Sequence, residues 1–259
     1  MMQCYIIGYP LNKPRSVKLW RSFFKKKKIP FQMSQLEVKP EKFNSEIKKI
    51  LISENFLASA ITMPYKKKIK KYAIINDKIS KYSNSVNFII KKDKKIFGYN
   101  TDVYGALNSI NKIEKKNIII YGFGGSGEAI FRTIYKMFPK SKFNVITKKK
   151  NIRGFSTSRV KFTRKIETTF LSTSNLFINC SPLGSNLSKN FLKSSPITNE
   201  ELKKLPRGSK IFDIVYSPKE TILKKMCKKL KITYTNGLKM NFDQADKALK
   251  IVEDYYLKR

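Results

Sequence analysis

Residues 117–131 read NIIIYGFGGSGEAIF, and they determine the fold expected for the chain. Residues 117–121 are mostly apolar and include three β-branched isoleucines, which is typical of a strand, and residues 127–131 begin a helical pattern. The glycines between them fit G-x-G-x-x-G, in which the first allows a tight turn, the second lets the backbone approach a pyrophosphate and the third lets helix and strand pack closely. The helix N-terminus adds free N–H groups. A dinucleotide-binding loop is therefore predicted at Gly122, Gly124, Gly125, Ser126 and Gly127.

The next expected strand, Phe143–Thr147, runs into Lys148, Lys149 and Lys150. About twenty residues beyond such a loop, an NAD enzyme usually places Asp or Glu on the ribose hydroxyls. No carboxylate occurs in this run, and ammonium groups there would attract a 2′-phosphate. The pattern favours NADP, with Thr147, Lys148 and Lys149 at the phosphate; the alternative is one more surface lysine run.

Alternating strands and helices on both sides of the loop predict an α/β protein whose Rossmann-type half is a doubly wound parallel sheet. After the loop we expect strands at Leu176–Asn179, Lys210–Val215 and Ile232–Thr235, helices at Gly127–Phe138, Thr221–Leu230 and Lys239–Leu257, and a long polar loop at Asn186–Ser195. Before it we expect strands at Gln3–Ile7, Phe31–Val38 and Ile61–Met63, helices at Ser16–Lys26 and Glu41–Ile52, and a hairpin of Val86–Ile90 with Lys95–Tyr99.

The composition limits the chemistry. The 259 residues include no histidine, which excludes Ser-His-Asp and Cys-His nucleophilic schemes and leaves acid–base work to Lys, Asp, Glu or Tyr. Three widely spaced cysteines predict reduced thiols and no structural zinc. No run approaches a membrane span or a signal peptide, so we expect a cytoplasmic protein without membrane contact.

The net charge of +37 raises the alternative of a nucleic-acid-binding protein. The lysines lie in short runs along the whole chain rather than in one arm, and neither an aromatic RNA-binding signature nor a zinc-knuckle spacing is present. Solvated lysine on most faces is the preferred interpretation, and no nucleic-acid partner is expected.

Several short motifs, in order along nearly the whole chain, resemble the shikimate dehydrogenase family. They are Gly8-Tyr-Pro10, Thr62-Met-Pro-Tyr-Lys66, Ser85-Val-Asn87, Asn100-Thr-Asp102 and Asn236-Gly-Leu-Lys-Met240 leading to Gln244. The resemblance implies a substrate-binding domain of residues 1–103 plus 237–259, an NADP-binding domain of residues 104–236 and an active site in the cleft between them. It also implies reversible reduction of 3-dehydroshikimate to shikimate, in the route to chorismate and the aromatic amino acids.

The resemblance assigns roles to individual residues. Lys66 and Asp102 match the pair that handles the proton at the reacting oxygen, and a lysine ammonium beside an aspartate suits protonation of the alkoxide that hydride transfer leaves. The residues implied to bind substrate are Ser16, Thr62, Asn87, Thr101, Tyr216 and Gln244, and Gly237 and Met240 join the glycine loop and Thr147–Lys149 in the cofactor site.

The family pattern is broken at a few positions. The segment Lys13-Pro14-Arg15-Ser16 lacks one of two serines that hold the substrate carboxylate, and Arg15 or Lys13 is the candidate replacement. Ala60 stands where asparagine is common, and Glu128 where the glycine loop is often followed by a basic residue. These departures indicate either a paralogue acting on quinate or another cyclic hydroxy acid, or a divergent but ordinary shikimate dehydrogenase, and we favour the second. A degenerate dehydrogenase that binds NADP without turnover is a separate alternative, and the intact Lys66 and Asp102 argue against it. A monomer or homodimer is expected.

Overall fold

The computed structural model describes residues 1–11, 14–110 and 116–257. The chain forms two compact units: Met1–Tyr104 with Phe242–Arg259, and Gly105–Asn241. Within the described ranges, no helix is long and apolar enough to cross a membrane. The fold prediction of an α/β unit joined to a Rossmann-type unit is confirmed.

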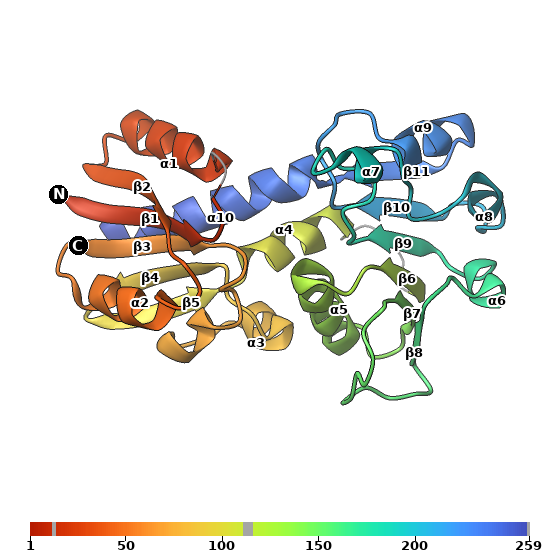
Figure 1. Ribbon diagram of the computed structural model, residues 1–259, viewed down its shortest axis with the longest axis horizontal. Helices are drawn as coiled ribbons and strands as arrows, with labels where there is room; N and C mark the ends of the chain where they lie inside the picture. The colour runs from red at the N-terminus through yellow and green to blue at the C-terminus, as the bar shows by residue number, and fades with distance from the viewer. Residues whose placement is uncertain (12–13, 111–115, 258–259) are drawn as a thin grey trace. The chain divides into compact units, whose positions relative to one another are not determined.

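The first unit is built on a mixed sheet with strand order β2-β1-β3-β4-β5 (Figure 1). Its strands are β1 (Met2–Gly8), β2 (Phe31–Glu37), β3 (Phe56–Ile61), β4 (Phe88–Lys92) and β5 (Lys95–Tyr99). β1 pairs in parallel with β2 and β3, whereas β3, β4 and β5 pair antiparallel. β4 and β5 form the hairpin that the sequence predicts.

Helices cover both faces of this sheet, because successive strand residues point to opposite sides. On one face, Cys4 and Ile6 of β1 pack with Trp20 of α1 (Arg15–Lys26) and Val252 of α10 (Gly237–Leu257). On the other face, Ile7 packs with residues of α2 (Phe43–Ile52) and of the 3₁₀ helix Ile69–Tyr72. The C-terminal helix α10 therefore completes the core of the first unit, although it is far in sequence from the other elements of that unit.

The second unit holds a six-stranded parallel sheet with strand order β11-β10-β9-β6-β7-β8 (Figure 1). Its strands are β6 (Asn117–Tyr121), β7 (Lys142–Ile146), β8 (Val160–Thr163), β9 (Leu176–Asn179), β10 (Lys210–Asp213) and β11 (Thr233–Asn236). Its helices are α5 (Gly125–Met137), α6 (Thr168–Leu171), α7 (Lys189–Leu192), α8 (Asn199–Lys203) and α9 (Ile222–Lys229). The strand order reverses at β6, where the glycine loop follows; in open α/β sheets, this is the position at which ligands bind.

The observed elements differ from the predicted ones in a few places. The strand expected at Ile61–Met63 lies earlier, as β3, because the small residues of Phe56–Ile61 weaken its β signal although five of the six are buried. The loop expected at Asn186–Ser195 contains the single turn α7, which Ser188 caps by accepting a bond from the Phe191 N–H. Strand β8 was not predicted, and neither were the 3₁₀ helix and the helices α3 (Lys78–Ser83), α4 (Thr101–Ile110), α6 and α8.

The three cysteines are buried free thiols. Burial raises the pKa of Cys4 and that of Cys227 to about 12, so both stay protonated at neutral pH. Among the described residues, no group of His, Cys, Asp and Glu side chains is arranged to hold a metal ion.

Candidate active site

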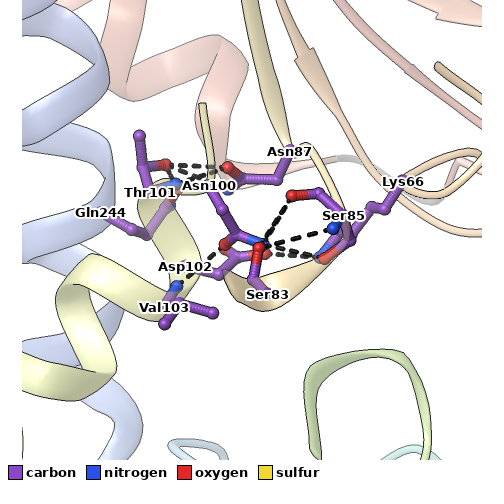
Figure 2. Close-up of polar contacts among 9 residues, drawn as sticks. All are labelled: Lys66, Ser83, Ser85, Asn87, Asn100, Thr101, Asp102, Val103 and Gln244. Carbon is purple, nitrogen blue, oxygen red and sulfur yellow. Dashed lines mark hydrogen bonds and ion pairs between the residues drawn. The ribbon is translucent and has the colours of Figure 1, made fainter. Parts of the chain in front are cut away.

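An ion pair between Lys66 and Asp102 lies at the centre of the candidate site. The Lys66 Nζ is 2.6 Å from Asp102 Oδ2, and the two side chains are 23% and 22% exposed. Solvent and a small molecule can therefore reach both groups. Figure 2 shows the pair beside a network of amide and hydroxyl side chains from the same unit.

Buried neighbours fix the backbone of Lys66. The ring of Tyr65 is fully buried and stacks on Phe43 with ring centroids 4.1 Å apart, and its hydroxyl donates to the Val38 carbonyl. The Lys66 carbonyl accepts a bond of 2.8 Å from the Val86 N–H. The lysine side chain thus projects from an anchored segment, although no regular element holds it.

Asn100 holds the start of α4, and therefore Asp102. Its Oδ1 accepts a 3.0 Å bond from the Val103 N–H, while its Nδ2 donates to the Ser83 hydroxyl at 3.0 Å and to the Ser85 hydroxyl at 2.9 Å (Figure 2). Asn100 is only 4% exposed. This capping role of Asn100 was not predicted, although an asparagine directly before a helix is a signal for it.

Three of the predicted substrate residues meet in one hydrogen-bonded cluster. The Asn87 Nδ2 donates to Thr101 Oγ1 at 3.0 Å, the Thr101 N–H donates to Asn87 Oδ1 at 2.7 Å, and Thr101 Oγ1 donates to Gln244 Oε1 at 3.3 Å. These side chains come from the residue before β4, from α4 and from α10. Because all are neutral donors and acceptors, the cluster suits hydroxyl groups rather than a charge.

The other predicted substrate residues lie outside this cluster. Ser16 is half-buried in the first turn of α1, and Thr62 follows β3 with its N–H donating to the Ile7 carbonyl at 2.9 Å. Tyr216 follows β10 and is half-buried, in the second unit. The predicted replacement ligands Lys13 and Arg15 cannot be placed, since Lys13 and the Arg15 side chain lie outside the described part of the chain.

The glycine loop divides into two packed and two open positions. A Cβ on Gly122 would lie 2.8 Å from the Ser181 nitrogen, and Gly122 also has a φ of +99°. A Cβ on Gly127 would lie 2.1 Å from the Gly122 carbonyl oxygen. Gly124 and Gly125 are exposed, and an added Cβ would meet nothing within 4 Å there. This pattern fits a loop whose backbone is open to a pyrophosphate at the start of α5.

One of the lysines after β7, Lys149, forms an ion pair with a carboxylate of α5 that was not predicted. Glu128 Oε2 lies 3.4 Å from Lys149 Nζ and Glu128 Oε1 lies 2.9 Å from Arg132 Nε. The run Lys148–Lys150 itself contains no carboxylate, as the sequence indicates, but Glu128 approaches Lys149 from α5.

Gly237 and Met240, both predicted to contact the cofactor, lie in the first turn of α10. A Cβ on Gly237 would be 2.0 Å from the Ile214 carbonyl oxygen, so close backbone packing requires glycine there. Met240 is 9% exposed.

A buried carboxyl, Asp213, ends β10 beside this region. It accepts bonds from Asn179 Nδ2 at 2.9 Å, the Val215 N–H at 3.0 Å and the Tyr234 hydroxyl at 2.8 Å. Burial nevertheless raises its pKa to about 6, because the hydrogen bonds offset only part of the desolvation.

Replacing Asp213 by Asn is expected to change the pH dependence of stability. The folded-state pKa of about 6 exceeds the ordinary 3.8, so protonation stabilises the fold, and this contribution is lost as the pH rises from about 4 to about 6. Relative to the original chain, Asp213→Asn should gain about 2 kcal/mol of unfolding free energy between pH 4 and pH 7.5. Urea unfolding of both proteins at the two pH values measures this gain. If the variant and the original chain differ in unfolding free energy by the same amount at pH 4 and at pH 7.5, the raised pKa of Asp213 is contradicted.

The chain is similar in sequence to known shikimate dehydrogenases. The sequence model described as "Shikimate dehydrogenase substrate binding domain" matches residues 6–89. A "Shikimate dehydrogenase (NADP(+))" of Clostridium botulinum strain 657 is 29% identical over 256 residues, which cover 94% of this chain and 93% of the relative. The chain is thus similar over nearly its whole length to NADP-dependent shikimate dehydrogenases, and residues 6–89 match the model of their substrate-binding domain.

Solved structures of shikimate dehydrogenases share the fold. One, crystallised in complex with NADP⁺, has a TM-score of 0.78 at 25% identity and covers 98% of this chain and 90% of its own. Another, from Thermus thermophilus in complex with NADP(H) and shikimate, has a TM-score of 0.77 at 18% identity and covers 98% and 94%.

The structure locates three residues that depart from the shikimate dehydrogenase pattern: Pro14, Ala60 and Glu128. Pro14 is the N-cap of α1 and makes no side-chain capping bond. Ala60 lies in β3, paired with Ile6 and Phe88. Glu128 is in the first turn of α5. The first two are in the unit that contains the Lys66–Asp102 pair, and the third is beside the glycine loop.

Proposed function

We propose that this chain is an NADP-dependent shikimate dehydrogenase that interconverts 3-dehydroshikimate and shikimate in chorismate and aromatic amino acid biosynthesis. The observation that carries the proposal is the 2.6 Å contact between Lys66 and Asp102 beside the Asn87, Thr101 and Gln244 cluster. The names of the relatives, the NADP-dependent shikimate dehydrogenases, supply the substrate and the cofactor.

In the proposed reaction, Lys66 supplies the proton. Bound NADPH supplies a hydride to the carbon of the ring ketone, and the C=O electron pair moves to the oxygen as an alkoxide. The Lys66 ammonium protonates this oxygen and becomes a neutral amine, which regains a proton from solvent. Asp102 orients the ammonium and stabilises its charge. In the oxidation of shikimate, the neutral Lys66 amine accepts the hydroxyl proton.

The polar cluster is proposed to select a ring that carries several hydroxyls. Its amide and hydroxyl groups bond to one another and can exchange those bonds for substrate hydroxyls without leaving a buried charge. The residues proposed to bind substrate are Ser16, Thr62, Asn87, Thr101, Tyr216 and Gln244. A paralogue's substrate, quinate or another cyclic hydroxy acid, is the second candidate, because Pro14 and Ala60 depart from the family pattern in this unit.

The cofactor is proposed to lie on the glycine loop of the second unit. The open backbone at Gly124 and Gly125 fits a pyrophosphate, and Lys148 and Lys149 fit a 2′-phosphate. The residues proposed to hold NADP are Gly122, Gly124, Gly125, Ser126, Gly127, Thr147, Lys148, Lys149, Gly237 and Met240. We assign residues 104–236 to the NADP-binding domain, and residues 1–103 plus 237–259 to the substrate-binding and catalytic domain, in which Gly237 and Met240 are the proposed exceptions that contact the cofactor.

We also propose that the protein acts in the cytoplasm as a monomer or homodimer, without a nucleic-acid partner. Its lysines are distributed over both units rather than gathered in one arm, which suits solvation better than nucleic-acid recognition.

Reduction of NADP⁺ by shikimate and by quinate tests the proposal. At moderately alkaline pH, absorbance of the reduced nicotinamide should rise rapidly with shikimate and at most slowly with quinate. Faster turnover of quinate would replace the substrate assignment. Binding of NADP⁺ without turnover of either acid would support the degenerate dehydrogenase.

A further inference from the structure

Glu128 is a buried carboxylate beside the glycine loop. It is 6% exposed and occupies the first turn of α5, four residues after Gly124. Its two oxygens pair with different cations: Arg132 Nε at 2.9 Å and Lys149 Nζ at 3.4 Å. A buried carboxylate needs compensating charge, and Arg132, one helical turn away, already supplies one cation.

Lys149 is the more exposed and more loosely held of these two cations. Its side chain is 53% exposed, against 30% for Arg132, and its contact with Glu128 is longer. The guanidinium of Arg132 also lies over the Phe155 ring, with its Cζ 5.1 Å from the ring centroid. Lys149 is therefore the partner that a second anion can recruit.

The position of Lys149 ties it to the dinucleotide loop. Its N–H donates to the Thr147 hydroxyl at 3.1 Å, and its Nζ lies 5.2 Å from the ring centroid of Phe123, the residue between Gly122 and Gly124. The ammonium thus lies over the loop itself, close to the carboxylate of Glu128. A 2′-phosphate approaching this ammonium meets a fixed negative charge at the same point.

We propose that Glu128 is a specificity-determining residue: it competes with the cofactor's 2′-phosphate for Lys149 and so narrows the preference for NADP over NAD. The inference rests on the proposed function, since it assumes that the glycine loop binds a dinucleotide. NAD and NADP share the pyrophosphate and differ at the 2′ position, so the competition for Lys149 acts on the 2′-phosphate of NADP and has no counterpart at the uncharged 2′-hydroxyl of NAD.

Replacing Glu128 by Gln removes the competing charge at nearly constant size. Titrations with 2′,5′-ADP and with 5′-AMP isolate the 2′-phosphate without needing turnover. In Glu128→Gln, the dissociation constant for 2′,5′-ADP is expected to fall about tenfold, while that for 5′-AMP changes less than about twofold. The matched control is Glu167→Gln, which removes a carboxylate paired with Lys161 at 3.1 Å in the same unit. It should change neither constant.

A second variant covers the case in which Glu128→Gln does not fold. Glu128→Asp keeps the charge but draws the carboxylate back by one methylene, so 2′,5′-ADP binding should strengthen by about threefold. An unchanged or weakened affinity for 2′,5′-ADP in the folded variant would overturn the competition. If neither nucleotide binds the original chain or any variant, the proposed dinucleotide function fails instead.

Discussion

The variant Lys66→Ala is expected to lose turnover of shikimate by about a thousandfold or more, because a positioned general acid contributes roughly 10²–10⁴ and its removal leaves Asp102 without its ion-pair partner. The affinity for NADP⁺ should stay within about twofold of the original, since the glycine loop belongs to the other compact unit. Steady-state kinetics and a direct NADP⁺ titration measure the two quantities separately.

The matched control is Lys68→Ala, which removes an exposed lysine two residues away and should leave both quantities unchanged. Turnover by Lys66→Ala at the original rate would remove the acid–base role from Lys66. Equal loss of turnover and of NADP⁺ binding would point to a folding defect, which thermal unfolding of the variant would reveal.

Replacing both Lys148 and Lys149 by Asp is expected to change the NADP-to-NAD ratio of kcat/KM by about a hundredfold or more towards NAD. Two attractive charges become two repulsive ones for the 2′-phosphate, and Glu128 adds a third carboxylate nearby. The ratio is measured with shikimate held saturating.

The control for the change in total charge is a variant in which two other exposed lysines, Lys228 and Lys229 in the last turn of α9, are both replaced by Asp. That variant should keep the original cofactor ratio. If the ratio is also unchanged in the Lys148 and Lys149 variant, these lysines are a solvated surface run and the phosphate is held elsewhere.

The central strands of the second unit, β6, β7, β9 and β10, were predictable because each is a short run with buried apolar residues. The predicted strands at Asn117–Tyr121 and Leu176–Asn179 coincide with β6 and β9. Strand β8 escaped prediction because Val160–Thr163 lies at the sheet edge, where only one of its residues is buried. Edge strands carry a weaker apolar signal than central ones.

The candidate site was predictable in its residue types but not in its contacts. Lys66 and Asp102 were expected to act together, and the structure places them in contact across 36 positions of sequence; their chemical roles stay predictions. The contact between Glu128 and Lys149 was not predicted, because it joins a helix to the end of a neighbouring strand. Sequence spacing relates residues within one element, whereas this contact depends on how α5 packs beside β7.

The most direct test of the proposed activity is the stoichiometry of the reduction itself. With NADPH and 3-dehydroshikimate supplied to the purified chain, we expect equimolar loss of NADPH and formation of shikimate, identified by chromatography. Loss of NADPH without shikimate, or no loss of NADPH at all, would contradict the proposed activity.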